Sequence, residues 1–211
     1  MRVTFSSGPL RLEGHLTLPA AATRGAVVCH PHPQYGGDMD NSVVIALARV
    51  LADTGHATLR FNFRGVGASD GSYAGGIGEA EDAYAAVSYV GERAGVQAVT
   101  LAGYSFGAMV ALHAGVCLPA VDRLIAVAPP LSFFDLTGLA ACTKDKLFIV
   151  GDADQYCGMA QLAQQLAHVA EPKTQRIISG ADHSFLGHEA ALIEAARSFA
   201  LTARQASTSG R

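Results

Sequence analysis

One serine of this chain lies in a setting that would make its hydroxyl group a nucleophile. Ser105 is the centre of a Gly-x-Ser-x-Gly motif that spans residues 103–107. An apolar run with strand character precedes the motif, and a helical pattern follows it. In such a sharp turn the serine hydroxyl projects from the sheet, and the backbone N–H of the next residue, Phe106, faces the oxyanion that forms when the serine attacks an acyl carbon. A glycine-rich helix start with a capping serine gives the same bare pattern, so the motif needs partners.

A serine nucleophile needs a histidine base and an acid that orients it, and the expected order along the chain is serine, acid, histidine. Candidates for both partners are present in this order. Asp152 and Asp154 directly follow the apolar strand predicted at Lys146–Val150, so both are candidates for the acid. His183 lies in the loop after the strand predicted at Thr174–Ile178. Each gap along the chain is long enough for the crossover that a parallel sheet requires.

The other histidines have less favourable positions for this role. His183 alone, of eight histidines, sits on a loop that directly follows a strand near the end of the chain. Five others belong to strand or helix patterns, where packing or solvation is the ordinary role: His15, His56, His113, His168 and His188.

The elements that would hold these residues alternate between strands and helices. The predicted strands are Leu10–Leu18 (an antiparallel edge strand), Gly25–Cys29, His56–Phe63, Val96–Ala102, Val121–Ala128, Lys146–Val150 and Thr174–Ile178. The predicted helices are Asn41–Thr54, a segment from Glu79 to Arg93, Ser105–Cys117, Met159–Val169 and His188–Ala203. This alternation predicts an α/β fold with a mostly parallel central sheet and helices on both faces. We expect a single domain over residues 1–204 and a flexible tail over residues 205–211.

Composition excludes several classes of protein. Half of the 211 residues are hydrophobic and only 16% are charged, which is not the composition of a disordered chain. The apolar runs are too short to cross a membrane, and a net charge of −3 argues against nucleic acid as the main partner. The four cysteines lack zinc-site spacing, and the first residues lack the apolar stretch of a signal peptide, so we expect a cytoplasmic protein. The last predicted strand and helix form an edge available for pairing in a homodimer.

The motifs resemble the α/β-hydrolase superfamily over roughly Leu10 to Leu201, and most of all its small, lid-poor members near the dienelactone-hydrolase and acyl-peptidase branches. Two further segments carry the resemblance: His30-Pro31-His32-Pro33 and Arg64-Gly65-Val66-Gly67-Ala68-Ser69. In one respect the chain departs from the dienelactone branch, which has a cysteine nucleophile where this chain has Ser105. We expect the turn from Arg64 to Asp70 to shape the floor beneath the site rather than to contact substrate.

The resemblance implies a catalytic triad of Ser105, Asp154 and His183. The family pattern Gly-x-x-Asp counts from Gly151 to Asp154, and two further residues give this acid the reach to turn back toward a neighbouring loop. Asp152 is then expected to accept hydrogen bonds from backbone N–H groups in its own turn.

The resemblance also implies that the loop after the Gly25–Cys29 strand supplies a second oxyanion donor. Its two prolines have no N–H and are excluded. His32 matches the family's donor position best, and Gln34 and Tyr35 are the alternatives. A metal site built from this loop is less favoured, because the resemblance accounts for both of its histidines as residues that shape the loop.

These residues predict a serine hydrolase that acts on small carboxylic acyl esters through an acyl-enzyme, with no cofactor and no metal. Larger superfamily members insert a cap domain where this chain has only residues 129–145. An open site suits short acyl groups, since nothing covers a long lipid chain, and Leu131, Phe133 and Phe134 are available as one apolar wall. A peptidase or amidase of the same fold, or a binding protein on a hydrolase scaffold, are the alternatives.

Overall fold

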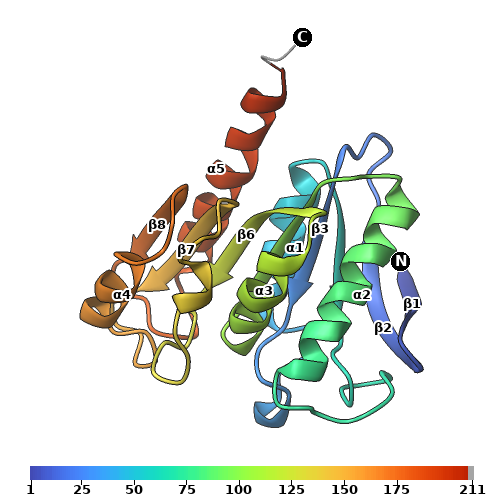
Figure 1. Cartoon of the computed structure of the whole chain (residues 1–211), viewed down its shortest axis with the longest axis horizontal. Coiled ribbons are helices and arrows are strands. Elements are labelled where there is room, and N and C mark those ends of the chain that lie inside the picture. Colours follow the sequence, from blue (N-terminus) through green and yellow to red (C-terminus); the bar gives the residue numbers. More distant parts are fainter. Residues whose placement is uncertain (209–211) are drawn as a thin grey trace.

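The computed structural model describes residues 1–208, which form one eight-stranded sheet with helices packed on it (Figure 1). The strands are β1 (Arg2–Ser7), β2 (Leu10–Thr17), β3 (Arg24–Cys29), β4 (His56–Phe61), β5 (Val99–Tyr104), β6 (Val121–Val127), β7 (Asp145–Gly151) and β8 (Lys173–Ile178). The helices are α1 (Ser42–Asp53), α2 (Ile77–Ala94), α3 (Phe106–Cys117), α4 (Met159–Leu166) and α5 (Glu189–Thr208), with short 3₁₀ turns η1 (Pro33–Tyr35) and η2 (Thr137–Leu139).

The strand order β1-β2-β4-β3-β5-β6-β7-β8 confirms the predicted fold class. Strand β2 pairs antiparallel with β1 and β4, and all the other pairs are parallel. The carboxyl ends of β3, β5, β6, β7 and β8 therefore meet at one edge of the sheet, where ligands bind in open α/β sheets. The loops that carry the predicted nucleophile, acid and base all leave the sheet at this edge.

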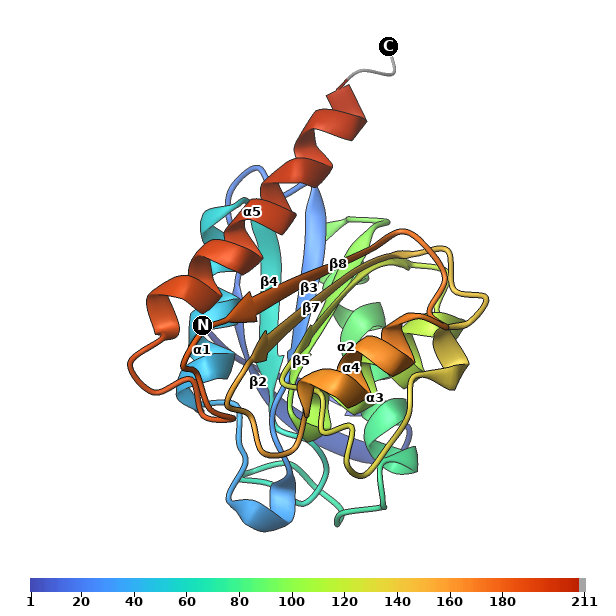
Figure 2. The ribbon, with the colours of Figure 1, turned by 90° about the vertical axis from the view of Figure 1, so that its left-hand side faces the viewer.

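The two faces of the sheet are covered by different helices (Figure 2). Helices α2, α3 and α4 belong to one apolar core, and α1 and α5 belong to the other. Every residue of β5 is buried, as expected for a central strand covered on both faces. Helix α3 is apolar around most of its circumference because it lies in the middle of its layer, against β5, β6 and α2.

Three features differ from the sequence prediction. Strand β1 was not predicted, and because it pairs outside β2, the Leu10–Leu18 segment is the second strand rather than the edge. Strand β5 begins at Val99 rather than Val96, since the N–H of Val96 donates to Gly91 O at the end of α2. Helix α5 continues to Thr208, past the end expected at Ala203, and residues 209–211 of the expected tail lie outside the described residues.

The connection between β6 and β7 contains η2 and no helix that caps the sheet edge. Within residues 1–208, no helix combines the length and the apolar character that crossing a membrane requires.

Candidate active site

Ser105 occupies a strained turn between β5 and α3. Its φ of 55° lies in the left-handed region, which a residue with a side chain rarely adopts, and its N–H donates to Val127 O at 2.9 Å. The two glycines of the motif are needed for close packing. A Cβ on Gly103 would lie 2.0 Å from the carbonyl oxygen of Gly107, and a Cβ on Gly107 would lie 2.3 Å from that of Cys29. The motif therefore builds a turn in which only the serine side chain can project from the sheet edge.

A chain of hydrogen bonds joins Ser105, His183 and Asp154. The Ser105 Oγ lies 2.9 Å from His183 Nε2, and His183 Nδ1 lies 3.0 and 2.9 Å from the two carboxylate oxygens of Asp154. A carboxylate only accepts, so Nδ1 carries the proton and Nε2 is free to accept the hydroxyl proton. The Asp154 side chain is fully buried, and the N–H groups of Tyr156 and Cys157 also donate to it.

Asp152 has a different position from Asp154 although it follows the same strand. It is exposed, and its carboxylate accepts hydrogen bonds from the Gly180 N–H at 2.6 Å and the Ser179 hydroxyl at 3.0 Å. These contacts connect the loop after β7 to the loop after β8. The structure thus places Asp154, and not Asp152, beside His183. Asp152 does accept a backbone N–H, but from Gly180 in the loop after β8 and not, as the sequence had predicted, from its own turn.

Tyr104, which directly precedes Ser105, contacts His183, the candidate base. Its hydroxyl donates to the backbone carbonyl of His183 at 2.9 Å, and the two ring centroids are 5.6 Å apart. Burial, with a smaller contribution from the charge of Asp154, raises the pKa of Tyr104 to about 12, so the hydroxyl keeps its proton. The sequence prediction missed this residue, and its place next to the nucleophile is the only signal that pointed to it.

The His32 loop faces Ser105 across the sheet edge. The His32 ring packs against the Phe106 ring at 4.8 Å. Of the three predicted donor candidates, two use their N–H groups inside the loop: Gln34 N–H donates to His32 Nδ1, and Tyr35 N–H donates to His32 O. Within the described residues, the backbone N–H groups of His32 and Phe106 have no acceptor. His32 and Tyr35 line the cavity in front of Ser105, whereas Gln34 does not.

His30 lies behind this loop and is completely buried. Its Nε2 accepts the Phe63 N–H at 3.0 Å, so its Nδ1 carries the proton and donates to Pro31 O at 2.6 Å. Burial lowers the pKa of His30 to about 4, which keeps the ring neutral. Both ring nitrogens are occupied by the chain itself, so His30 shapes the loop and has no lone pair left for a metal.

A cavity of about 710 Å³, here called the reaction cavity, opens in front of Ser105. Aromatic side chains form much of its wall: Tyr35, Tyr73, Tyr104, Phe106, Phe133 and Tyr156. The sequence prediction of an apolar wall from residues 131–134 holds for Phe133 in this cavity, whereas Phe134 lines a neighbouring cavity and Leu131 is part of the core. Tyr73 was missed although it follows soon after the Arg64–Ser69 segment, because we expected that turn to shape the floor and not to contact substrate.

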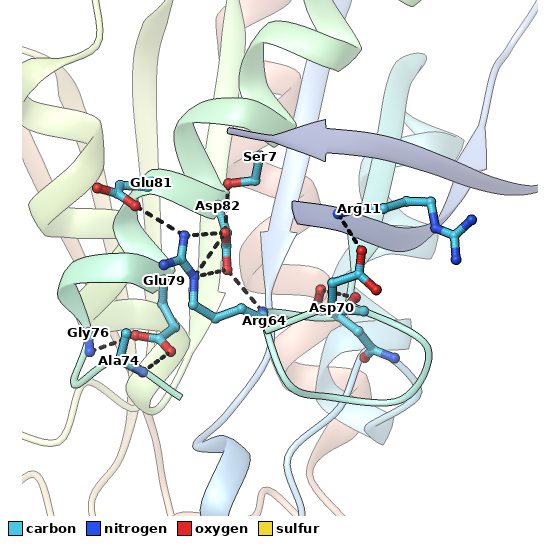
Figure 3. Close-up of polar contacts among 11 residues, drawn as sticks. Ser7, Arg11, Arg64, Asp70, Ala74, Gly76, Glu79, Glu81 and Asp82 are labelled. Carbon is cyan, nitrogen blue, oxygen red and sulfur yellow. Dashed lines mark hydrogen bonds and ion pairs between the residues drawn. The ribbon is translucent and has the colours of Figure 1, made fainter. Parts of the chain in front are cut away.

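A buried ion pair joins the turn after β4 to helix α2 (Figure 3). The Arg64 guanidinium bonds to the carboxylate of Asp82 at 2.8 Å, and that carboxylate also accepts the Arg64 N–H and the Ser7 hydroxyl. Asp82 is fully buried on α2, so these contacts tie α2 to the turn after β4 and to β1. The turn from Arg64 to Asp70 lines neither cavity. Its contacts are with the scaffold, in line with the role the sequence suggested.

The fold and the hydrogen-bonded Ser105–His183–Asp154 chain define a class of protein, and comparisons agree with it. The family model of the alpha/beta hydrolase fold matches residues 27–141, more than half of the chain. This protein belongs to the α/β-hydrolase family.

Several relatives cover most of this chain. An uncharacterized protein of Rickettsia prowazekii (strain Madrid E) is 34% identical over 198 residues, and the match covers 87% of this chain and 82% of the relative. The structure of an alpha-beta serine hydrolase homologue from Coxiella burnetii superposes with a TM-score of 0.87 at 34% identity, covering 93% of this chain and 95% of that one. A serine hydrolase without a lid from Xanthomonas campestris gives a TM-score of 0.82 at 33% identity, covering 93% and 91%.

Proposed function

We propose that this protein is a serine hydrolase that cleaves small carboxylic acyl esters in two steps through an acyl-enzyme. The observation that carries the proposal is the continuous hydrogen-bonded chain from Asp154 through His183 to Ser105, which ends at an open cavity. A carboxylate, an imidazole and a hydroxyl in this order form the arrangement that activates a serine for acyl transfer.

In the proposed first step, the Ser105 oxygen attacks the ester carbonyl carbon while His183 Nε2 takes the hydroxyl proton. Asp154 keeps the Nδ1 proton in place and stabilises the imidazolium that forms. The ester C–O bond then breaks, and His183 gives its proton to the departing alcohol oxygen. Water attacks the acyl-enzyme by the same route, which restores Ser105 and releases the acid.

The negative charge on the carbonyl oxygen needs donors that are in place before the reaction. We assign this role to the backbone N–H groups of Phe106 and His32, which have no acceptor within the described residues. The N–H groups of Gln34 and Tyr35 are less suitable, because each already donates to His32. Removal of one such donor typically costs about 10²–10³ in rate.

The aromatic wall favours esters with a compact alcohol group. Phe133 and Tyr156 are 5.9 Å apart between ring centroids, and Tyr156 lies 4.8 Å from the His183 ring, so the alcohol side of the site is narrow and apolar. The experiment compares two substrates with the same chromophore, a short acyl ester and an aminoacyl amide, for wild-type protein and Ser105→Ala. We expect the ester to be hydrolysed faster and Ser105→Ala to lose nearly all turnover.

Two results would contradict the proposal. Faster cleavage of the amide would identify a peptidase or amidase instead. Unchanged ester turnover by Ser105→Ala would remove the serine mechanism altogether, and a binding protein on a hydrolase scaffold would then fit better.

A further inference from the structure

A second cavity, the α3 groove, adjoins the reaction cavity. Its volume is about 520 Å³, and it lies between one face of α3, the start of α2 and the segment around η2. In Figure 1 the start of α2 and the yellow η2 segment flank α3. Most of its wall is aliphatic or aromatic: Ile77, Met109, Val116, Phe134, Leu136 and Leu139.

The two cavities adjoin at Gly75 and Met109, which line both. Met109 is one turn of α3 beyond the nucleophile, and its N–H donates to Ser105 O at 3.2 Å. At Gly75 a Cβ would meet nothing within 4 Å, so space is open there. A substrate whose carbonyl group lies at Ser105 would therefore reach the groove past Gly75 and the flexible side chain of Met109. The Cε of Met109 lies 3.2 Å from the position of a Cβ on Gly76.

The groove leaves apolar surface in contact with water. Ile77, on its rim, is 79% exposed. Of the nine large hydrophobic side chains that the described residues expose, Ile77 lines the groove, and three line the adjoining reaction cavity: Tyr35, Phe133 and Tyr156. Such a concentration of exposed apolar groups marks a binding surface.

The only carboxylate in the groove is directed into its own turn. Asp135 Oδ1 accepts hydrogen bonds from the Thr137 hydroxyl and from the Thr137 N–H, the latter at 2.9 Å. These bonds lower the pKa of Asp135 and satisfy part of its hydrogen-bonding capacity locally. The groove thus offers a ligand mainly apolar contacts and no fixed positive charge.

The wall at Gly75 is held in a fixed position (Figure 3). Glu79 is completely buried, and its two carboxylate oxygens accept the N–H groups of Ala74 at 2.8 Å and Gly76 at 2.7 Å, on either side of Gly75. The φ of Gly75 is +69°, a conformation that residues with side chains rarely adopt. The loop segment that borders both cavities is therefore held in place by Glu79.

We propose that the α3 groove binds the acyl chain of the ester whose carbonyl carbon Ser105 attacks, and that it favours a linear aliphatic chain of medium length. This inference rests on the proposed esterase function. The departing alcohol must lie beside His183 Nε2 to receive its proton, and His183 lies against Tyr104 and Tyr156, which line the reaction cavity alone. The α3 groove, which adjoins the reaction cavity at Met109, is then available for the acyl chain.

The length of the groove sets the length of the chain. From Ser105 to Val116 helix α3 rises by about 16 Å at ~1.5 Å per residue, which accommodates an extended chain of roughly ten carbons. The expectation of short acyl groups came from the absence of a cap over the site. The groove changes that expectation, because it gives a longer chain an apolar surface without a cap.

The first experiment measures kcat/KM for two series of esters with the wild-type protein. One series varies the acyl chain from acetate to dodecanoate with nitrophenol as the common leaving group, and the other varies the alcohol with acetate as the common acyl group. We expect kcat/KM to rise at least ~10-fold from the butanoate to the octanoate, because each methylene buried from water favours binding several-fold. A flat or falling acyl series, or a rise confined to the alcohol series, would overturn the proposal.

A pair of matched variants tests whether the gain in kcat/KM for octanoate depends on the α3 groove. His113 lines the groove and His168 lines neither cavity, and both are exposed. His113→Trp should remove most of the octanoate gain and leave butanoate hydrolysis within about twofold of wild type, whereas His168→Trp should keep the full gain. Equal behaviour of the two variants, each checked for folding by circular dichroism, would also overturn the proposal.

A chemical block gives an independent test. Cys117 lies in the groove and is exposed, whereas Cys29, Cys142 and Cys157 are buried, so a bulky maleimide should react at Cys117. Modified wild-type protein should lose the octanoate gain and keep butanoate hydrolysis, and Cys117→Ser treated in the same way should be unaffected.

Failure of the groove and failure of the esterase proposal give different results. If the groove assignment is wrong, short esters are still hydrolysed in a Ser105-dependent manner with no dependence on chain length. If the esterase proposal is wrong, no member of either series is hydrolysed, or Ser105→Ala hydrolyses them as fast as wild type.

Discussion

His30 and His183 both use their two ring nitrogens in hydrogen bonds close to Ser105, yet their partners differ. His30 lies between a backbone carbonyl and a backbone N–H, neither of which acts as an acid or a base near neutral pH. His183 lies between a carboxylate and a hydroxyl group, and it borders the reaction cavity. The comparison shows that burial and a complete set of hydrogen bonds make a histidine structural, while access to a cavity and to a transferable proton makes it a candidate base.

The largest expected effect is a difference in kcat between variants of the two aspartates that follow β7. In Asp154→Asn the amide can donate to His183 Nδ1, which favours the tautomer that cannot accept the Ser105 proton, and kcat should fall by ~10⁴. Asp152→Asn is the matched control. It should change kcat little, because Asp152 accepts hydrogen bonds only from Ser179 and Gly180. Assays on one ester near neutral pH would contradict the assignment if the order of the two losses were reversed.

A second prediction concerns stability and tests the structural role of His30. Its pKa is lowered to about 4 in the folded protein, against 6.5 in the unfolded chain. Between these values the unfolded state binds a proton that the folded state does not, so acidification removes about 3 kcal/mol from the free energy of unfolding. This contribution is fully present above pH 6.5 and is lost as pH falls to about 4.

Urea denaturation at several pH values measures this loss. Carboxylates also titrate at the lower end of the range, so the comparison with His30→Gln isolates the contribution of the histidine. The variant should be less stable at neutral pH, because it disturbs the bonds to Pro31 and Phe63, and its stability should depend less on pH. Equal pH dependence in both proteins would show that His30 is not held neutral.

The smallest expected effect sharpens the account of how His183 is held. Tyr104→Phe removes the hydroxyl that donates to His183 O, a bond worth about 1 kcal/mol, so kcat should fall roughly three- to tenfold. Since the hydroxyl holds the base and not the substrate, KM should stay within about twofold. Tyr156→Phe is the control, because the Tyr156 hydroxyl has no hydrogen-bond partner within the described residues. A rise in KM with unchanged kcat would assign Tyr104 to substrate binding instead.

The sequence predicted those features of the molecule that are determined by residues close together in the chain. Local patterns pointed to three residues: the flanking glycines to Ser105, the place after β7 to Asp154, and the loop position to His183. The structure brings these three side chains together. The alternation of strands and helices was likewise sufficient for the fold class.

Other parts depend on contacts that no local pattern contains. Strand β1 buries few side chains, and in the sequence only the pair Gly8-Pro9 signalled its hairpin with β2; the structure shows that Gly8 has a positive φ. The α3 groove is formed by three segments far apart in the sequence, so its apolar residues looked like ordinary core. The choice among His32, Gln34 and Tyr35 required knowing which N–H groups the loop itself uses.

Covalent labelling with a fluorophosphonate tests the central claim most directly, because the reagent needs an activated serine and no knowledge of the substrate. Labelling of the wild-type protein near neutral pH, followed by peptide mass spectrometry, should place one adduct on the peptide that contains Ser105. Ser105→Ala should take up no label, and Asp154→Asn should be labelled far more slowly than Asp152→Asn. Absence of an adduct on the folded wild-type protein, or an adduct that persists in Ser105→Ala, would contradict the account.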